Sequence, residues 1–136
     1  MNTDTNKTIH EKALKTGYTY LLVTIFVAFA GFFYERFSHN VFSYFMLYAF
    51  AFPLLGAFVY LTLAIAKVKF YPSIVTSQLL VATISTFCVG SIIMGVLEIY
   101  GTTSYLAGIY WCVGTVLSLL TVVAFIWDIV KYRQKK

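Results

Sequence analysis

Four long stretches of apolar residues follow one another along the chain, separated by short polar segments. They cover about residues 17–34, 42–66, 73–97 and 105–127. Each is close to or longer than the roughly 20 residues that an α-helix needs to cross the ~30 Å hydrocarbon layer of a bilayer. None shows the strict alternation of apolar and polar positions that is typical of a strand, and lipid permits only helices or closed barrels. The pattern therefore predicts four transmembrane helices.

Short polar segments connect these predicted spans, so each helix should run antiparallel to the next. The expected fold is all-α: a polytopic membrane protein with a bundle of four transmembrane helices. A polar N-terminal segment precedes it, in which Thr8 and Glu11 fit the spacing of a capping box for a short amphipathic helix that continues into the first span. The predicted parts are a cytoplasmic N-terminal segment (1–16), a membrane domain (17–128) and a basic cytoplasmic tail (129–136).

The composition supports a lipid environment. The chain has 136 residues, of which 60% are hydrophobic and only 11% are charged, whereas soluble domains carry about 25% charged residues. The net charge is +5, but the basic residues sit at the ends of the apolar stretches and form no basic face with interleaved aromatics. We therefore do not expect nucleic acid as a partner. The expected partner is the lipid bilayer.

The basic residues also predict the orientation in the membrane. Nine of the ten lie before the first span, between the second and third spans, or after the fourth, and only Arg36 lies on the other side. Lys and Arg accumulate on the cytoplasmic side of membrane proteins. We therefore expect a multi-pass protein of the cytoplasmic membrane with both termini in the cytoplasm. The nine residues are Lys7, Lys12, Lys15, Lys67, Lys69, Lys131, Arg133, Lys135 and Lys136.

Two glutamates recur at matching places in the two halves of the chain. Glu35 and Glu98, 63 residues apart, each end an apolar stretch and are followed by one residue and then an aromatic. Two helical hairpins that enter the membrane from the same side would be parallel repeats, a plan found in some transporters. Basic clusters and turns at this spacing would appear in any antiparallel four-helix protein, so the matched glutamates alone favour a duplication.

Both glutamates continue stripes of small or weakly polar residues at helical spacing. Small residues mark helix–helix contacts in lipid because they let backbones approach closely. Both carboxylates should therefore face the bundle. The two stripes are Gly17, Leu21, Thr24, Ala28 and Gly31 in the first span, and Ser77, Val81, Ile84, Cys88, Ser91 and Gly95 in the third.

Each glutamate is predicted to end its helix, where a negative charge opposes the helix macrodipole. They could be interfacial residues with no further role. Alternatively they converge, in which case mutual repulsion and burial should keep one of them protonated at neutral pH. Such a pair would suit proton coupling or the capture of a cation, with Arg36 and His39 nearby in the same turn.

Aromatic residues and one proline complete the candidate site. Tyr44, Tyr48, Tyr100 and Tyr110 could offer hydrogen bonds or cation–π faces to a ligand. Pro53 removes one helical hydrogen bond in the middle of the second span and should kink it, with Gly56 one turn later as a second hinge residue. A tolerated membrane proline without a hinge role is the alternative.

The remaining chemistry is sparse. Cys88 and Cys112 show no metal-ligand spacing, and we find no nucleophile–base pair or phosphate-binding loop. We therefore expect no enzyme, no metal and no cofactor. The sequence favours a protein that binds or transports a small, cationic or amphiphilic solute through Glu35 and Glu98, as a homodimer or with a membrane-protein partner. The alternative is a membrane subunit or regulator of a larger complex with no transport of its own.

Overall fold

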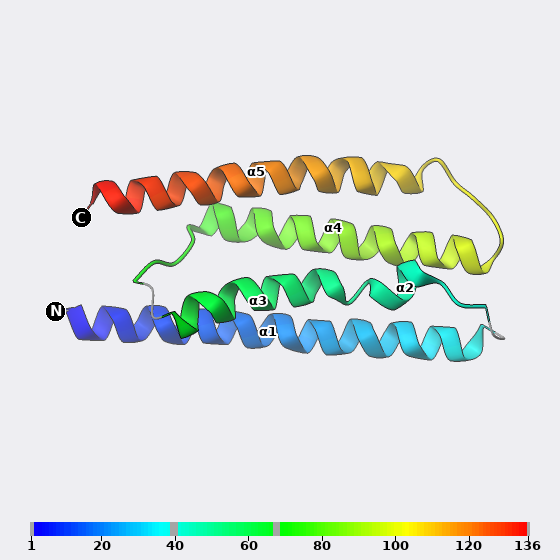
Figure 1. Cartoon of the computed structure of the whole chain (residues 1–136), viewed down its shortest axis with the longest axis horizontal. Helices are drawn as coiled ribbons and strands as arrows, with labels where there is room; N and C mark the ends of the chain where they lie inside the picture. Colours follow the sequence, from blue (N-terminus) through cyan, green and yellow to red (C-terminus); the bar gives the residue numbers. More distant parts are fainter. Residues whose placement is uncertain (1, 39–40, 67–68, 136) are drawn as a thin grey trace.

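The computed structural model describes residues 2–38, 41–66 and 69–135, and this part of the chain forms helices joined by short connections (Figure 1). Four helical segments are long and apolar enough to cross a membrane, which confirms the predicted all-α bundle with four transmembrane helices. Both termini lie at one end of the molecule. The helices are α1 (Asn2–Phe37), α2 (Tyr44–Tyr48), α3 (Ala51–Ile65), α4 (Ile74–Ile99) and α5 (Ala107–Gln134).

Helix α1 begins well before the first apolar stretch. The capping box predicted at Thr8 is wrong, because Thr8 lies inside the helix and its hydroxyl donates to the carbonyl oxygen of Asp4, at 2.8 Å. With 36 residues and a rise of 1.5 Å per residue, α1 is about 54 Å long. This length exceeds the ~30 Å of hydrocarbon, so the polar first turns of α1 extend beyond the apolar layer.

The second span is broken into α2 and α3 by a turn at residues 49–50 (Figure 1). Pro53 has no N–H to offer the carbonyl of Ala49, so the helical hydrogen bonds are interrupted there. The side chain of Pro53 is fully buried, and α3 continues from it without a break. The predicted kink is thus confirmed, while a hinge motion at this place stays a prediction.

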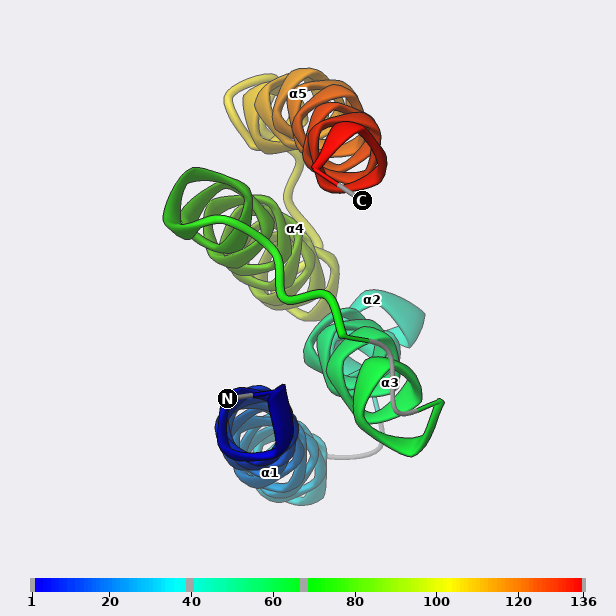
Figure 2. The ribbon, with the colours of Figure 1, turned by 90° about the vertical axis from the view of Figure 1, so that its left-hand side faces the viewer.

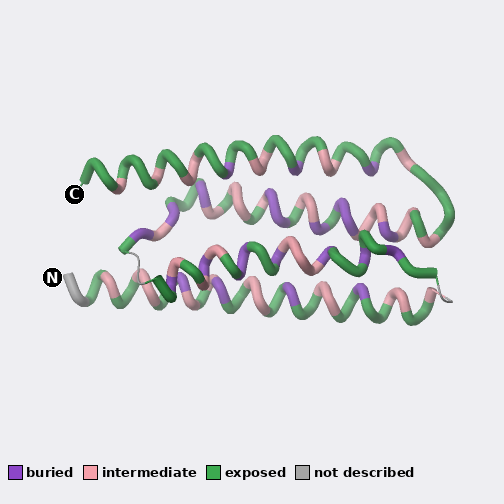
Figure 3. The backbone as a smooth tube through the Cα atoms, in the orientation of Figure 1, coloured by how far each residue is buried: buried purple, intermediate pink, exposed green. Residues whose placement is uncertain are grey.

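The four spans lie side by side in an open row, in the order α1, α3, α4 and α5 (Figure 2). The most extensive contacts join α1 to α3 and α4 to α5, and α2 and α3 connect these two hairpins through α4. Buried and exposed residues alternate along every helix (Figure 3). The outer helix α5 is the least covered: only 11% of its most apolar stretch is buried, against 33% for the α2–α3 span.

The two hairpins bury small residues at the same spacing. Seven residues separate the buried Thr24 and Gly31 in α1, and seven separate the buried Cys88 and Gly95 in α4. The partner helices repeat the pattern with Ala57 and Ala64 in α3 and Gly114 and Thr121 in α5. This agrees with two parallel hairpins, although α5 has no counterpart of the break between α2 and α3. A true duplication stays a prediction.

Near the end that carries the termini, a buried tyrosine of α3 joins the two hairpins. Tyr60 of α3 is 1% exposed, stacks on Tyr20 of α1 with ring centroids 5.7 Å apart, and donates a hydrogen bond of 3.0 Å to Ser77 of α4. One residue of α3 therefore touches both of its neighbouring helices.

Candidate functional site

The two predicted glutamates end α1 and α4 on either side of α2. Gly31 and Gly95, one turn before them, both lie against Met46 of α2: a methyl group would come within 3.1 Å of its carbonyl oxygen at Gly31 and 2.8 Å of its Cβ at Gly95. The small-residue stripes predicted from the sequence do face the helix contacts, with most members buried and Val81 exposed. Glu35 and Glu98 consequently lie at the same end of the molecule, beside the start of α2.

A left-handed residue ends α4 directly after Glu98. Gly101 has φ +66°, which glycine adopts without the steric cost that a Cβ would bring. Its N–H donates to the carbonyl of Glu98 at 3.1 Å, and the N–H of Thr102 donates to the carbonyl of Leu97 at 3.0 Å. This is a Schellman ending, and it satisfies the last carbonyls of the helix.

The Glu98 side chain accepts a hydrogen bond from the serine that precedes α2. Ser43, the residue before α2 and 1% exposed, donates from its hydroxyl to Oε2 of Glu98 at 2.6 Å. A hydrogen bond to a carboxylate stabilises by about 1.5–3 kcal/mol, so this contact ties the end of α4 to the start of α2. The rest of Glu98 remains exposed.

Glu35 is different because one of its oxygens has no partner. Its Oε1 is enclosed and accepts no hydrogen bond within the described part of the chain. The hydroxyl of Ser38 lies close by but donates to the backbone carbonyl of Glu35, at 2.9 Å, and not to the carboxylate. Leaving a buried acceptor unsatisfied costs about 1–3 kcal/mol, and more when the group is charged. A proton, a water molecule or a bound cation would each supply the missing interaction.

A cavity of about 350 Å³ lies between the ends of the two helices that carry the glutamates. Tyr34 and Tyr100 both line it, so the end of α1 lies next to the end of α4. Its walls offer three aromatic rings and three hydroxyl groups, and neither glutamate is among the residues that line it. The lining residues are Tyr34, Phe37, Ser38, Ile99 and Tyr100.

The other predicted tyrosines lie elsewhere. Tyr100 lines the cavity, but Tyr44 and Tyr48 of α2 are 72% and 57% exposed, so neither side chain is held against it. Tyr110 packs on Gly90, where a methyl group would come within 2.7 Å of its Cβ. The structure thus brings Tyr100 to the site and gives Tyr110 a packing role between α4 and α5.

The remaining predicted residues divide between packing and the surface. Arg36 is exposed. His39 lies outside the described residues. Pro53 and Gly56 are buried between the helices, far from the ends that carry the glutamates. Tyr34, which the sequence analysis did not select, is the new member of the site; its position directly before Glu35 was the available signal.

A third carboxylate, that of Asp128 in α5, forms an anchor at the opposite end of the molecule. Its Oδ2 accepts hydrogen bonds from the backbone N–H of Ser73 at 2.8 Å and from the hydroxyl of Thr76 at 2.6 Å. Ser73 is the N-cap of α4, where the helix dipole also favours a negative charge. The sequence analysis missed this anchor, although Asp128 stands alone between the last apolar stretch and the basic tail.

Replacing Asp128 with alanine should lower the free energy of unfolding by about 2 kcal/mol, because two donors at the start of α4 lose a charged acceptor. Asp128→Asn should lower the free energy of unfolding by less, since the amide oxygen can still accept these hydrogen bonds. Thermal unfolding of the purified protein in a mild detergent, followed by circular dichroism, measures both variants. Glu11→Ala is the control, because Glu11 is an exposed carboxylate on α1; if it matched Asp128→Ala, the anchor would have no specific effect.

The two cysteines are the remaining reactive side chains. Cys88 is buried in α4, Cys112 is exposed on α5, and both are free thiols. The described residues contain no group of three or more His, Cys, Asp or Glu side chains placed to hold a metal ion. Comparison with known proteins found no matching family model, no matching curated protein and no matching solved structure.

Proposed function

We propose that this chain is a small integral membrane protein that binds and transports a small cationic or amphiphilic solute, with Glu35 and Glu98 as the coupling residues. The observation that carries this proposal is the enclosed oxygen of Glu35 that lacks a hydrogen-bond partner. Ionisable residues within membrane spans are costly and usually functional. A carboxylate that is half-buried and incompletely paired is therefore better explained by a ligand than by stability.

The chemistry around the glutamates suits a cation. The cavity between the helix ends presents the rings of Tyr34, Phe37 and Tyr100, and aromatic faces attract organic cations within about 6 Å. Its volume of about 350 Å³ falls within the range of small-molecule sites. Glu35 and Glu98 do not line the cavity, so their carboxylates would attract the positive charge from just outside it while the rings hold the apolar body. A proton and the solute would compete for the free oxygen of Glu35, which would couple their movements.

The orientation belongs to the same proposal. Nine of the ten basic residues fall in the sequence before the first span, between the second and third spans, or after the fourth, and only Arg36 falls between the first and second spans. The positive-inside rule then assigns both termini to the cytoplasm and the glutamate site to the outer face of the cytoplasmic membrane.

Converting both Glu35 and Glu98 to glutamine should reduce solute uptake at least tenfold, because removing one partner of a desolvated charge pair costs several kcal/mol of binding. The measurement is uptake of ethidium, a fluorescent organic cation, into proteoliposomes under a proton gradient. Glu11→Gln, which removes the same charge from the exposed face of α1, should transport like the unaltered protein. Equal uptake by the double variant, with unchanged helix content, would reject the glutamate site.

A non-transporting membrane subunit is the second candidate. It is favoured by the open row of helices, in which α5 leaves most of its apolar surface uncovered. A larger complex, or a second copy of this chain, would cover such a face. Purification in a mild detergent followed by mass determination distinguishes these cases, since a stoichiometric partner supports the subunit and a lone chain with ethidium uptake supports the transporter.

A further inference from the structure

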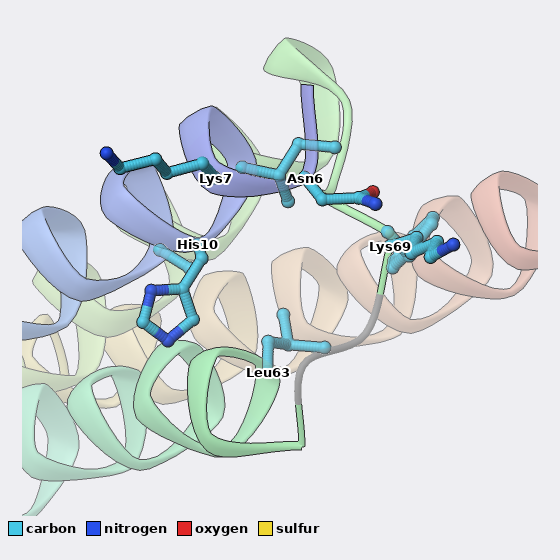
Figure 4. Close-up of a pocket in the computed structure, with 8 residues that line it drawn as sticks. Asn6, Lys7, His10, Leu63 and Lys69 are labelled. Atoms are coloured by element: carbon cyan, nitrogen blue, oxygen red, sulfur yellow. The ribbon is translucent and has the colours of Figure 1, made fainter. Parts of the chain in front are cut away.

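A second cavity, of about 380 Å³, opens at the end of the molecule that carries the termini (Figure 4). Its walls come from the first turns of α1, from Leu63 near the end of α3, and from the connection between α3 and α4. Figure 4 shows Asn6 and Lys69 at one edge of this cavity, His10 closer to Leu63, and the side chain of Lys7 extending on the side opposite Lys69. We call it the basic cleft; its lining residues are Asn6, Lys7, Ile9, His10, Ala13, Leu63, Lys69 and Phe70.

The basic cleft combines a cationic and polar rim with an apolar floor. Lys7, His10 and Lys69 supply nitrogen donors, whereas Ala13 and Phe70 in the floor are 2% and 8% exposed. No carboxylate is among its lining residues within the described chain. A ligand that satisfies both parts carries a negative headgroup and an apolar body.

The position of the basic cleft along α1 agrees with such a ligand. Ala13 lies four residues before Gly17, where the first apolar stretch begins, which corresponds to about 6 Å along the helix. The headgroup layer on each side of a bilayer is about 5–8 Å thick. The apolar floor therefore lies at the depth of the headgroups, and Lys7, six residues before Ala13 on α1, lies about 9 Å further from the hydrocarbon layer.

A neighbouring cavity of about 310 Å³ shares Lys69 and Phe70 and adds Lys131 and Lys135. It also contains Asp128, whose negative charge would repel a phosphate. Of the two basic cavities at this end, the one without a carboxylate is the better anion site.

We propose that the basic cleft binds the phosphate of an anionic phospholipid, with Lys7 and Lys69 as the charged contacts and the glycerol region of the lipid against Ala13 and Phe70. Basic residues at the membrane surface attract anionic lipids, and basic pockets between helices bind their headgroups. This site is independent of the solute site, because the two lie at opposite ends of the molecule.

The test compares two double variants that lose the same charge. Lys7→Gln with Lys69→Gln removes both charged contacts, whereas Lys12→Gln with Lys15→Gln changes two exposed lysines of α1 outside the cleft. The unfolding temperature of each full-length protein is measured in detergent micelles while dioleoylphosphatidylglycerol, dioleoylphosphatidylcholine or inorganic phosphate is titrated in. Circular dichroism in the plain detergent verifies that all of them fold.

Phosphatidylglycerol should raise the unfolding temperature of the unaltered protein, as a ligand of the folded state does, and phosphatidylcholine should not. The Lys7/Lys69 variant should bind phosphatidylglycerol at least tenfold more weakly, and the Lys12/Lys15 variant should bind it within twofold of the unaltered protein. Equal losses in both variants would mean a diffuse surface effect, and no loss in either would remove the cleft from lipid binding. A full response to inorganic phosphate alone would identify a free-anion site; each of these three results overturns the proposal.

Discussion

Adding one methyl group at Gly95 should destabilise the protein by about 2 kcal/mol and detach Ser43 from Glu98. The new Cβ would lie 2.8 Å from Cβ of Met46 and 3.0 Å from its backbone nitrogen. No rotamer change moves these two atoms, so α2 itself must shift away from α4. Overpacking of this kind costs about 1–3 kcal/mol, and the hydrogen bond of 2.6 Å between Ser43 and Glu98 depends on the same contact.

Two other glycines serve as controls for Gly95→Ala. Gly108→Ala should be neutral or slightly stabilising, because nothing lies within 4 Å of its added methyl group and alanine is the better helix former. Gly114→Ala should fall between them, since its neighbour is the ring of Phe87 at 2.8 Å, which can turn aside. Thermal unfolding in detergent should show the largest loss of stability for Gly95→Ala, a smaller loss for Gly114→Ala and none for Gly108→Ala. If Gly95→Ala were as stable as Gly108→Ala, the close contact between α4 and α2 would not hold this end together.

The spans and the kink could be predicted because their causes are local. Continuous apolar stretches leave helices as the only plausible spanning structure, and Pro53 interrupts the hydrogen bonds of its own helix wherever that helix packs. It was also predictable that the small-residue stripes face other helices. Glycines such as Gly31 and Gly95 permit close helix contacts whichever helix packs on them. The predicted N-terminal helix does continue into the first span, but its start was wrong: α1 begins at Asn2, six positions before the predicted cap at Thr8, where the apolar pattern gives no signal.

The candidate site was only half predictable because its contacts depend on residues far apart in the chain. Ser43 and Glu98 are separated by 55 residues, as are Ser73 and Asp128. In both pairs a serine at the start of one helix meets a carboxylate near the end of its antiparallel neighbour. A single serine before an apolar stretch indicates no more than a helix cap. The sequence therefore predicted Glu98 as a site residue but not its hydrogen bond with Ser43. Tyr44 and Tyr48 of α2 are exposed, which was not predictable for a similar reason, since periodicity alone could not tell which face of a kinked helix meets α4; their role at the site stays a prediction.

Truncating Tyr60 to alanine should have the largest effect on stability, a loss of about 3 kcal/mol in the free energy of unfolding. Tyr60 is among the largest fully buried side chains, and removing a large core aromatic costs about 3–5 kcal/mol. We expect the lower end of this range, because lipid surroundings remove the hydrophobic part of the cost and leave mainly lost packing. The stacking on Tyr20 and the contact with Tyr71, whose ring centroid is 5.9 Å away, would both disappear.

Two further variants separate packing from hydrogen bonding at this position. Tyr60→Phe keeps the ring and loses only the hydrogen bond to Ser77, so it should cost about 1 kcal/mol or less. Tyr18→Ala removes the same side chain from α1, where it is 60% exposed, and should change stability by no more than about 0.5 kcal/mol. Because α1 and α4 lie on opposite sides of α3 in the row, Tyr60 joins the two hairpins. A loss for Tyr60→Ala no larger than that for Tyr18→Ala would show that the hairpins are held together elsewhere, by the contact of Met46 with Gly31 and Gly95.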